Sequence, residues 1–266
     1  MESFVKSKIL CIGDIILDSY VQGKVERISP EAPIPVFKLG NEKFVLGGAA
    51  NVARNICAGG GSCYLISVVG KDEDSEILDK LIKQERNLSV KLLRIKNRKT
   101  TKKQRYISGQ QQVLRIDNET NEEISLQHEK IIFEYFKNSF ESFDVIVISD
   151  YNKGLLTYSL VQKIILLAKK HKKPIVVDPK RDSFEIYKGA TVITPNFKEL
   201  MKANKDSFQK PTIETRKIEF FSRDLIKKYN LNTVITTRSF NGLSVITKNK
   251  EAITLSSEAL EVFDVS

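Results

Sequence analysis

The chain has 266 residues, enough for one large α/β domain, and 41% of them are hydrophobic, which excludes a disordered chain. Its net charge of +10 comes from 43 basic residues interspersed with 33 acidic ones, so we expect anionic small-molecule ligands and no nucleic acid. No run of about 18 apolar residues occurs, and the first residues lack a signal-peptide pattern. The sequence therefore predicts a cytoplasmic protein without a membrane partner.

Short apolar runs alternate with longer amphipathic stretches along the chain. The runs lack the alternation of a half-buried strand, which predicts strands that are buried on both faces in a mainly parallel sheet. They lie at 9–12, 64–69, 145–148, 175–177, 192–193 and 234–235. Helical patterns lie between them, at 49–58, 74–86, 126–139, 157–171 and 212–229. This alternation predicts a doubly wound α/β sheet flanked by helices.

Two segments do not fit the alternation. Residues 18–46 and 91–117 have the pattern of short strands and turns, with polar and apolar residues alternating in places. They are too rich in β pattern to be crossover connections. We expect them to form a small β flap at one edge of a single domain that spans residues 1–266.

Residues that follow the strands are the first candidates for chemistry, because open parallel sheets bind ligands beyond the carboxyl ends of their strands. Asp14 and Asp18 follow the first strand, and ionised carboxylates can accept hydrogen bonds from sugar hydroxyls. Turn and cap chemistry explains them equally well. Gly47 and Gly48 open the next helix, where small residues let the backbone and Asn51 approach a ligand. A glycine turn with close helix packing is the alternative.

The segments 13–18 and 47–53 resemble the substrate signatures of the ribokinase-like sugar kinases, the phosphofructokinase B group. The resemblance runs from residue 8 to the C-terminus. Neither a dinucleotide fingerprint nor a P-loop is present. Within the family, further segments are similar to the kinases of D-glycero-β-D-manno-heptose 7-phosphate. They lie at 27–36, 47–53, 111–117, 149–154, 178–180 and 189–196. One departure is Arg181, which stands where a glycine is expected.

The resemblance implies ATP-dependent phosphorylation of this sugar phosphate at its anomeric hydroxyl, in ADP-heptose and lipopolysaccharide core synthesis, with Mg²⁺ as cofactor. The sugar hydroxyls would be held beneath the flap, which excludes water. The residues implied at the sugar are Asp14, Asp18, Gly47, Gly48 and Asn51.

The phosphate that this substrate already carries requires cations nearby. Lys102, Lys103 and Arg105 of the flap segment are candidates, and Arg105 is favoured because its planar fork binds phosphate with two hydrogen bonds. A solvated flap face is the alternative for each lysine. Lys153 and Lys180 also follow strands that face the same cleft, and Lys180 is the better phosphate contact of the two.

Asn196, Phe197, Lys198 and Glu199 follow a short strand and open a helix. By resemblance this N-x-x-E signature serves the nucleotide: the Asn196 amide would donate to an ATP phosphate, and Glu199 would hold a magnesium-bound water. The same spacing is also a capping box that satisfies a helix start. The resemblance favours the functional interpretation.

Thr237, Arg238 and Gly242 lie where a strand ends and turns into a hairpin. By resemblance this is a nucleotide loop, in which Thr237 and the turn backbone approach the phosphates. Arg238 would stabilise the charge that develops on the transferred phosphoryl group. Without the resemblance, the segment is an ordinary turn.

The family signature that carries the catalytic base, D-[TV]-[TS]-G-A-G-D, begins at Asp264, so the base would lie about four positions beyond Ser266. We therefore expect an incomplete kinase domain that is marginally folded and nearly inactive by itself. Two alternatives stay open, a non-catalytic remnant that binds the sugar phosphate and a kinase for another sugar phosphate. The flap is also expected to pair two copies into a homodimer.

Overall fold

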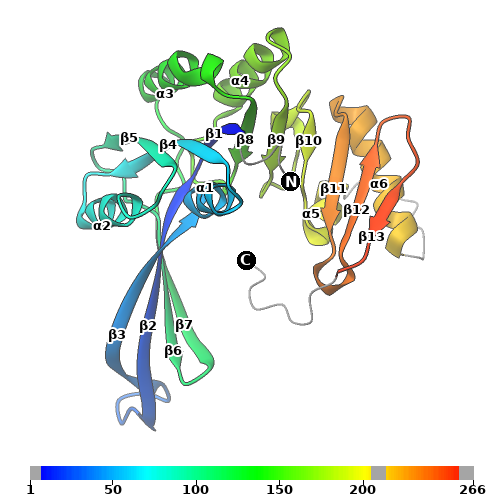
Figure 1. Cartoon of the computed structure of the whole chain (residues 1–266). Coiled ribbons are helices and arrows are strands. Elements are labelled where there is room, and N and C mark those ends of the chain that lie inside the picture. Colours follow the sequence, from blue (N-terminus) through cyan, green and yellow to red (C-terminus); the bar gives the residue numbers. More distant parts are fainter. Residues whose placement is uncertain (1–6, 205–213, 258–266) are drawn as a thin grey trace.

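Two sheets make up the fold. A computed structural model describes residues 7–204 and 214–257. A nine-stranded sheet carries helices, and a four-stranded sheet projects from one side of it (Figure 1). This arrangement confirms the predicted doubly wound α/β fold with a small β flap.

The nine-stranded sheet is mainly parallel. Its strands are, in spatial order, β13 (Ile253–Leu255), β12 (Leu243–Thr247), β11 (Thr233–Thr237), β10 (Val192–Ile193), β9 (Ile175–Asp178), β8 (Val145–Ser149), β1 (Lys8–Gly13), β4 (Ser62–Gly70) and β5 (Leu88–Ile95). The strands from β5 to β11 are parallel to one another, whereas β12 pairs antiparallel with β11, and β13 pairs antiparallel with β12. The carboxyl ends of seven strands therefore meet at one edge of the sheet.

Helices cover both faces of this sheet. They are α1 (Ala49–Ala58), α2 (Glu73–Ile82), α3 (Leu126–Ser139), α4 (Tyr158–Lys170), α5 (Phe197–Ala203) and α6 (Glu214–Tyr229), with short 3-10 turns η1 (Phe140–Ser142), η2 (Glu185–Tyr187) and η3 (Ser239–Asn241). Residues 212 and 213 of the last predicted helix lie outside the described residues. None of the described helices is long and apolar enough to cross a membrane.

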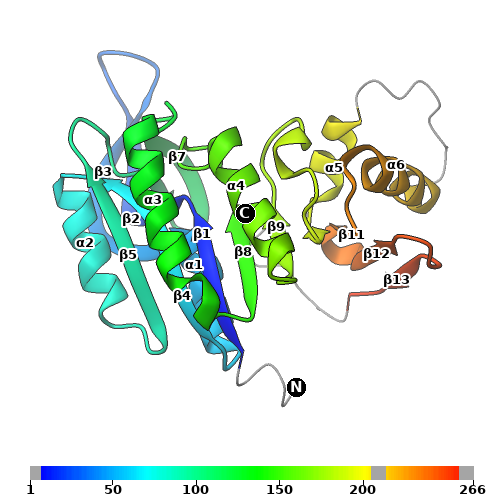
Figure 2. The same ribbon diagram turned by 90° about the horizontal axis from the view of Figure 1, so that it is seen from above.

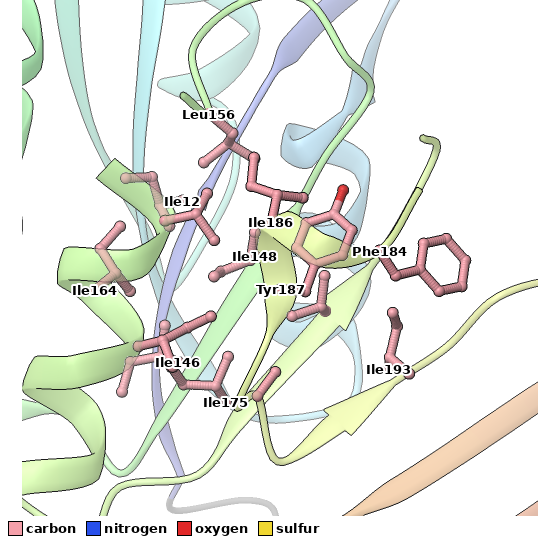
Figure 3. Close-up of a cluster of buried hydrophobic side chains, with 14 of the residues drawn as sticks. Ile12, Ile146, Ile148, Leu156, Ile164, Ile175, Phe184, Ile186, Tyr187 and Ile193 are labelled. Atoms are coloured by element: carbon pink, nitrogen blue, oxygen red, sulfur yellow. The ribbon is translucent and has the colours of Figure 1, made fainter. Parts of the chain in front are cut away.

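Each face has its own hydrophobic cluster, because neighbouring side chains of a strand point to opposite faces. On β1, Leu10 and Ile12 join the larger cluster with α3, α4 and α6, whereas Cys11 joins a smaller cluster with α1 and α2. Figure 2 shows α3 and α4 side by side on their face, and Figure 3 shows part of the larger cluster. The ring of Tyr187 is buried in it.

The flap consists of β2 (Ile15–Ile28), β3 (Pro35–Gly48), β6 (Lys102–Ser108) and β7 (Gln111–Asn118), in the order β3-β2-β6-β7. Its predicted second segment began too early, because residues 91–95 belong to β5 of the main sheet. The reason is that β5 is an edge strand paired only with β4. Its side chains are therefore unevenly buried, and its sequence pattern resembles that of a flap strand.

The chain changes direction across the sheet at β1. It first fills the side of β4 and β5 and later the side of β8 to β11. Gly13 pairs with Ser149, so Asp14 and Asp150 are the residues that leave β1 and β8 side by side. Such a topological switch point opens a crevice at the carboxyl ends of the two strands, where ligands bind in this class of sheet.

Candidate functional site

Asp14 lies at the switch point, and its side chain is 3% exposed. Its Oδ2 accepts hydrogen bonds from the backbone amides of Tyr151 and Lys153, at 3.0 and 3.1 Å. Its Oδ1 is buried and has no partner among the described residues. Burial, and secondly the carboxylate of Asp150, raises the pKa of Asp14 from 3.8 to about 6. At neutral pH the carboxylate is ionised and keeps an acceptor oxygen for a hydroxyl group.

Asp18 lies on β2 of the flap and is held by a cation. Arg105 Nη1 donates to Asp18 Oδ1 at 2.6 Å, and the guanidinium lies 5.3 Å from the centre of the Tyr20 ring. On the neighbouring strand, a Cβ atom at Gly47 would lie 2.0 Å from Asp18 Oδ2. Only a glycine lets β3 approach this carboxylate so closely.

The start of α1 joins the two carboxylates. The amide of Ala49 donates to the carbonyl of Asp14 at 2.9 Å, and the N-cap residue Gly48 provides no side-chain cap. Asn51, in the first turn, accepts a hydrogen bond from Arg54 Nη2 through its Oδ1 at 2.9 Å. Of the residues predicted at the sugar, the structure therefore places Gly48 next to Asp14 and Gly47 next to Asp18, and Asn51 lies in the first turn of α1.

The flap lysines lie on opposite faces of β6, as alternate strand residues must. Lys102 pairs with Asp74 at 3.1 Å on the face away from Asp18. Lys103 is the register partner of Asp18 and forms no ion pair within the described part of the chain. Burial lowers the pKa of Lys103, the carboxylate of Asp117 on β7 opposes this shift, and the positive charge of Lys153 adds to it. An anion at Lys103 would relieve this unfavourable environment.

The predicted nucleotide segment forms a complete capping box at the start of α5. Asn196 Oδ1 accepts from the amide of Glu199 at 2.9 Å, and Glu199 Oε2 accepts from the amide of Asn196 at 2.8 Å. The other carboxylate oxygen of Glu199 lies 3.2 Å from Lys180 Nζ. Phe197 packs on the larger hydrophobic cluster, and Lys198 is exposed. The structural interpretation of this motif is confirmed, and it leaves Glu199 oriented by its backbone contact.

Lys180 lies between two carboxylates. Besides its contact with Glu199, Lys180 Nζ lies 3.5 Å from Asp178 Oδ1. Burial lowers the pKa of Lys180, but Asp178 and Glu199 outweigh burial and raise it. Burial raises the pKa of Asp178, and Glu199 adds to that shift. Lys180 is therefore already neutralised by protein groups and is a weaker candidate for a phosphate contact than its sequence position indicates.

The turn after β11 lies next to the start of α5. Thr237 and Asn196 form an isolated parallel bridge. Arg238 Nη2 donates to the carbonyl of Asn241 at 2.8 Å, so this side chain closes its own turn. Gly242 has φ of 84°, a conformation that suits glycine. The two predicted nucleotide segments are brought together, and Arg238 would have to leave Asn241 to reach a phosphoryl group.

Magnesium ions usually keep several waters and use few protein carboxylates. Within residues 7–204 and 214–257 no group of three or more potential metal ligands occurs. Glu199, of the predicted nucleotide segment, and Asp178 are acidic side chains that both lie near Lys180 Nζ. This donor set fits a water-mediated magnesium contact that accompanies a nucleotide, and Asp264 lies outside the described residues.

Two site residues were not singled out as such from the sequence. Asp150 is fully buried at the switch point, and Arg181, noted only as a departure from the family pattern, donates from Nε to Asp150 Oδ2 at 2.7 Å. Lys153, named as a cleft lysine, instead donates to Glu119 Oε1 at 2.7 Å. The sequence offered one signal for Asp150, which is an acidic residue directly after a buried strand. A charge buried there needs a partner, so a nearby cation could have been sought.

Solved structures share this architecture. The phosphofructokinase-2 of Escherichia coli superposes with a TM-score of 0.75 at 18% identity, over 96% of this chain and 81% of that one. The ribokinase of Arabidopsis thaliana gives 0.69 at 14% identity, over 97% and 80%. These likenesses define the class of the fold, a ribokinase-like α/β fold.

Curated relatives narrow the assignment. The bifunctional protein HldE of Rhodospirillum rubrum is 36% identical over 264 residues, and that of Caulobacter vibrioides is 39% identical over 269 residues. Each match covers 99% of this chain but only 52% or 53% of the relative, so the chain spans about half the length of these relatives. Residues 6–266 match the model of the pfkB family carbohydrate kinases, and the chain belongs to that family.

Proposed function

We propose that this chain is the sugar-binding part of a kinase that transfers a phosphoryl group from ATP to the anomeric hydroxyl of D-glycero-β-D-manno-heptose 7-phosphate. This step would feed ADP-heptose and lipopolysaccharide core synthesis. The observation that carries the proposal is the face of the flap that bears Asp18, because the same face also bears the cations Lys103 and Arg105. A sugar that is phosphorylated at one end needs both kinds of group.

The hydroxyl end of the substrate would lie at the switch point. Asp14 Oδ1 is an unpaired acceptor in a buried site, and an unmet acceptor gains more from a hydroxyl donor there than in water. Asp18 and the Asn51 amide would bind neighbouring hydroxyls of the same sugar. These contacts would orient the sugar before transfer, which is where much of the rate enhancement of a phosphoryl transfer arises.

The phosphate end would lie against Lys103 and Arg105. Lys103 has no ion-pair partner in the described part of the chain, and burial depresses its pKa although the carboxylate of Asp117 opposes that shift. Lys102 faces the opposite side, where Asp74 already neutralises it. We therefore favour Lys103 over Lys102. The E. coli phosphofructokinase-2 was solved in complex with fructose-6-phosphate, so the same fold accommodates another sugar phosphate.

The nucleotide would lie between α5 and the turn after β11. The Arabidopsis ribokinase was solved with ribose and ATP, which supports ATP as the donor. Bound Mg²⁺–ATP would supply the phosphoryl group and neutralise its charge. Glu199 would hold a magnesium-bound water, and the backbone near Thr237 would contact the phosphates. The flap would keep bulk water from the sugar, so that ATP is not hydrolysed.

Replacement of Lys103 by methionine tests the phosphate end. We expect Lys103→Met to weaken binding of heptose 7-phosphate about 10- to 100-fold, because it removes a charge-assisted hydrogen bond to a phosphate. Affinity for unphosphorylated heptose should change little. Isothermal titration calorimetry of the chain with both sugars, and with fructose 6-phosphate, measures this preference.

Lys102→Met is the matched control, because it removes the neighbouring charge on the other face of β6. It should leave sugar phosphate binding near that of the unmodified chain. Equal affinity for phosphorylated and free heptose would contradict a sugar phosphate substrate. Tighter binding of fructose 6-phosphate than of heptose 7-phosphate would instead favour a kinase for another sugar phosphate.

Glu199 separates the capping and nucleotide interpretations of the N-x-x-E motif. Glu199→Gln keeps an oxygen that can accept from the amide of Asn196, whereas Glu199→Ala removes the cap and should cost about 0.5–2 kcal/mol of stability. We expect both variants to reduce the magnesium-dependent gain in ATP affinity about tenfold or more. A fluorescent ATP analogue titrated with and without Mg²⁺ measures this gain. If Glu199→Gln keeps the full gain, Glu199 is a cap only.

Homodimerisation through the flap stays a prediction. The flap exposes large apolar side chains, and such side chains favour association when they lie together on one surface. The exposed ones are Ile28, Ile34, Leu39, Val113, Leu114 and Ile116.

A further inference from the structure

Asp150 is a buried carboxylate that the proposed chemistry does not use. It is the first residue after β8, and its side chain is 0% exposed. Its Oδ2 accepts from Arg181 Nε at 2.7 Å and from the Tyr187 hydroxyl at 2.6 Å, and its Oδ1 accepts from the amide of Asn152 at 2.7 Å. A buried charge is tolerated only with such partners. The cluster therefore keeps a negative charge in one fixed position.

Arg181 is the cation of this cluster, and it has a second anchor. Its Nη2 donates to the carbonyl of Leu156 at 2.6 Å, and its side chain is 20% exposed. Burial lowers the pKa of Arg181, but Asp150 outweighs burial and raises it. The Tyr187 ring lies within the larger hydrophobic cluster (Figure 3). Both donors are thus fixed from outside the sugar site.

The turn that follows Asp150 links this cluster to Asp14. Asn152, at φ of 56°, is held by its amide hydrogen bond to Asp150. On either side of Asn152, the amides of Tyr151 and Lys153 point at Asp14 Oδ2. The same atoms that orient the Asp14 carboxylate are therefore placed by the Asp150 side chain.

We propose that Arg181 is a positioning residue, which holds Asp150 and the 150–154 turn so that the Asp14 carboxylate presents its unpaired oxygen to the substrate. The proposal rests on the proposed role of Asp14 in binding the sugar. Among the described residues, the side chain of Arg181 donates to Asp150 and to the carbonyl of Leu156, so it orients Asp14 through Asp150, and its charge also acts on Asp14. This role explains an arginine where the family pattern leads to a glycine, because a glycine cannot neutralise Asp150.

Charge supports the same assignment. The charged groups that act on Asp14 are the carboxylate of Asp150 and the guanidinium groups of Arg98 and Arg181. Arg98 also ties the turn to the base of the flap, because it donates to the carbonyls of Lys153 and Thr120. Without Arg181 the charge of Asp150 would act on Asp14 with less compensation, and Asp14 would become harder to ionise.

The test compares Arg181→Met with Arg181→Lys and with the double variant Asp150→Asn/Arg181→Met. The ¹³C signal of the Asp14 carboxyl group is titrated by NMR, together with the amide signals of Tyr151 and Lys153. We expect the midpoint of the unmodified chain near pH 6 to move upward in Arg181→Met. In the double variant, which also removes the repelling charge of Asp150, the midpoint should return toward that of the unmodified chain. In Arg181→Lys it should lie between the midpoints of the unmodified chain and Arg181→Met.

Binding gives the functional measurement. Affinity for heptose 7-phosphate at pH 7 should fall about 10- to 100-fold in Arg181→Met, because the Asp14 carboxylate would no longer be held in the orientation that binds the sugar. ATP affinity should stay the same. Arg94→Met is the matched control, because Arg94 forms an ion pair with Asp79 of α2 and is not part of the Asp150 cluster. It should lower stability without moving the Asp14 titration.

The outcomes separate the hypotheses. If Arg181→Met lowers stability but leaves the Asp14 titration and the two amide signals unchanged, Arg181 is purely structural and the proposal is overturned. If that variant does not fold, Tyr187→Phe removes one hydrogen bond to Asp150 and should move the midpoint in the same direction; no movement overturns the proposal. An unmodified chain that binds no heptose 7-phosphate contradicts the proposed function, whereas the titration still decides the role of Arg181.

Discussion

Replacement of Asp14 by asparagine is expected to remove sugar binding and yet make the fold more stable at pH 8. Burial raises the pKa of Asp14 from 3.8 to about 6, so the folded chain favours the neutral carboxyl group. The stability that this group contributes is fully present below pH 3.8 and is lost as the pH rises through about 6. A shift of about two units corresponds to about 3 kcal/mol, which Asp14→Asn should regain at pH 8 because asparagine never ionises.

Urea unfolding at pH 8 and pH 4 measures this effect, and calorimetric titration with heptose 7-phosphate measures binding. At pH 4 most of the gain should vanish, because the native carboxyl group is then largely neutral as well. Asp144→Asn is the control, since Asp144 is an exposed carboxylate that accepts from the amide of Lys8. If Asp14→Asn gains the same stability at both pH values, the destabilisation does not come from the charge of Asp14.

This opposition between stability and binding has a physical origin at the switch point. Two carboxylates, Asp14 and Asp150, leave adjacent strands into a buried space where their charges repel. A sequence selected for stability alone would remove one of them. The cluster around Arg181 reduces the repulsion instead, so the fold keeps an ionised, partly unpaired acceptor where a ligand can use it. Functional sites commonly retain such unfavourable groups.

The sequence predicts the buried elements well because their patterns are strong. Strands such as β1 and β8 are apolar on both faces, and α3 has the predicted bounds Leu126–Ser139. The prediction failed at β5, where the strand lies at the sheet edge and its pattern is mixed. Edge strands and flap strands share that pattern, so only the hydrogen bonds to β4 distinguish them.

The positions of candidate residues in the fold were predictable where these residues follow a strand directly. Asp14 and Thr237 were placed at the cleft for that reason, and Asn196 lies beside Thr237 as expected of neighbouring strand ends. The contact between Asp150 and Arg181 was not predictable, because it joins residues 31 positions apart across a loop. The opposite directions of Lys102 and Lys103 follow from β6 being a strand, but which of them faces Asp18 depends on its register with β2.

Replacement of Gly13 by alanine is expected to destabilise the fold strongly. A Cβ atom there would lie 2.1 Å from the carbonyl oxygen of Ser149, which is backbone of the adjacent strand and cannot rotate away. The strands β1 and β8 would have to separate in the centre of the sheet. We expect a loss of about 3 kcal/mol or more, the upper range for overpacking of a core, from a total stability of about 5–15 kcal/mol.

The same change should also disturb the site, because the carbonyl of Ser149 accepts the amide of Asp14 at 3.2 Å and the carbonyl of Gly13 accepts from the Ser67 hydroxyl at 2.6 Å. Urea unfolding at pH 5 measures the loss of stability, and sugar affinity measures the disturbance. Gly61→Ala is the matched control, since the nearest atom to its Cβ would be 3.2 Å away. Equal losses for both variants would show that the close approach of β1 and β8 is not what requires glycine. A larger loss at Gly13 together with weaker sugar binding would mean that the spacing of these two strands both stabilises the sheet and sets the position of Asp14.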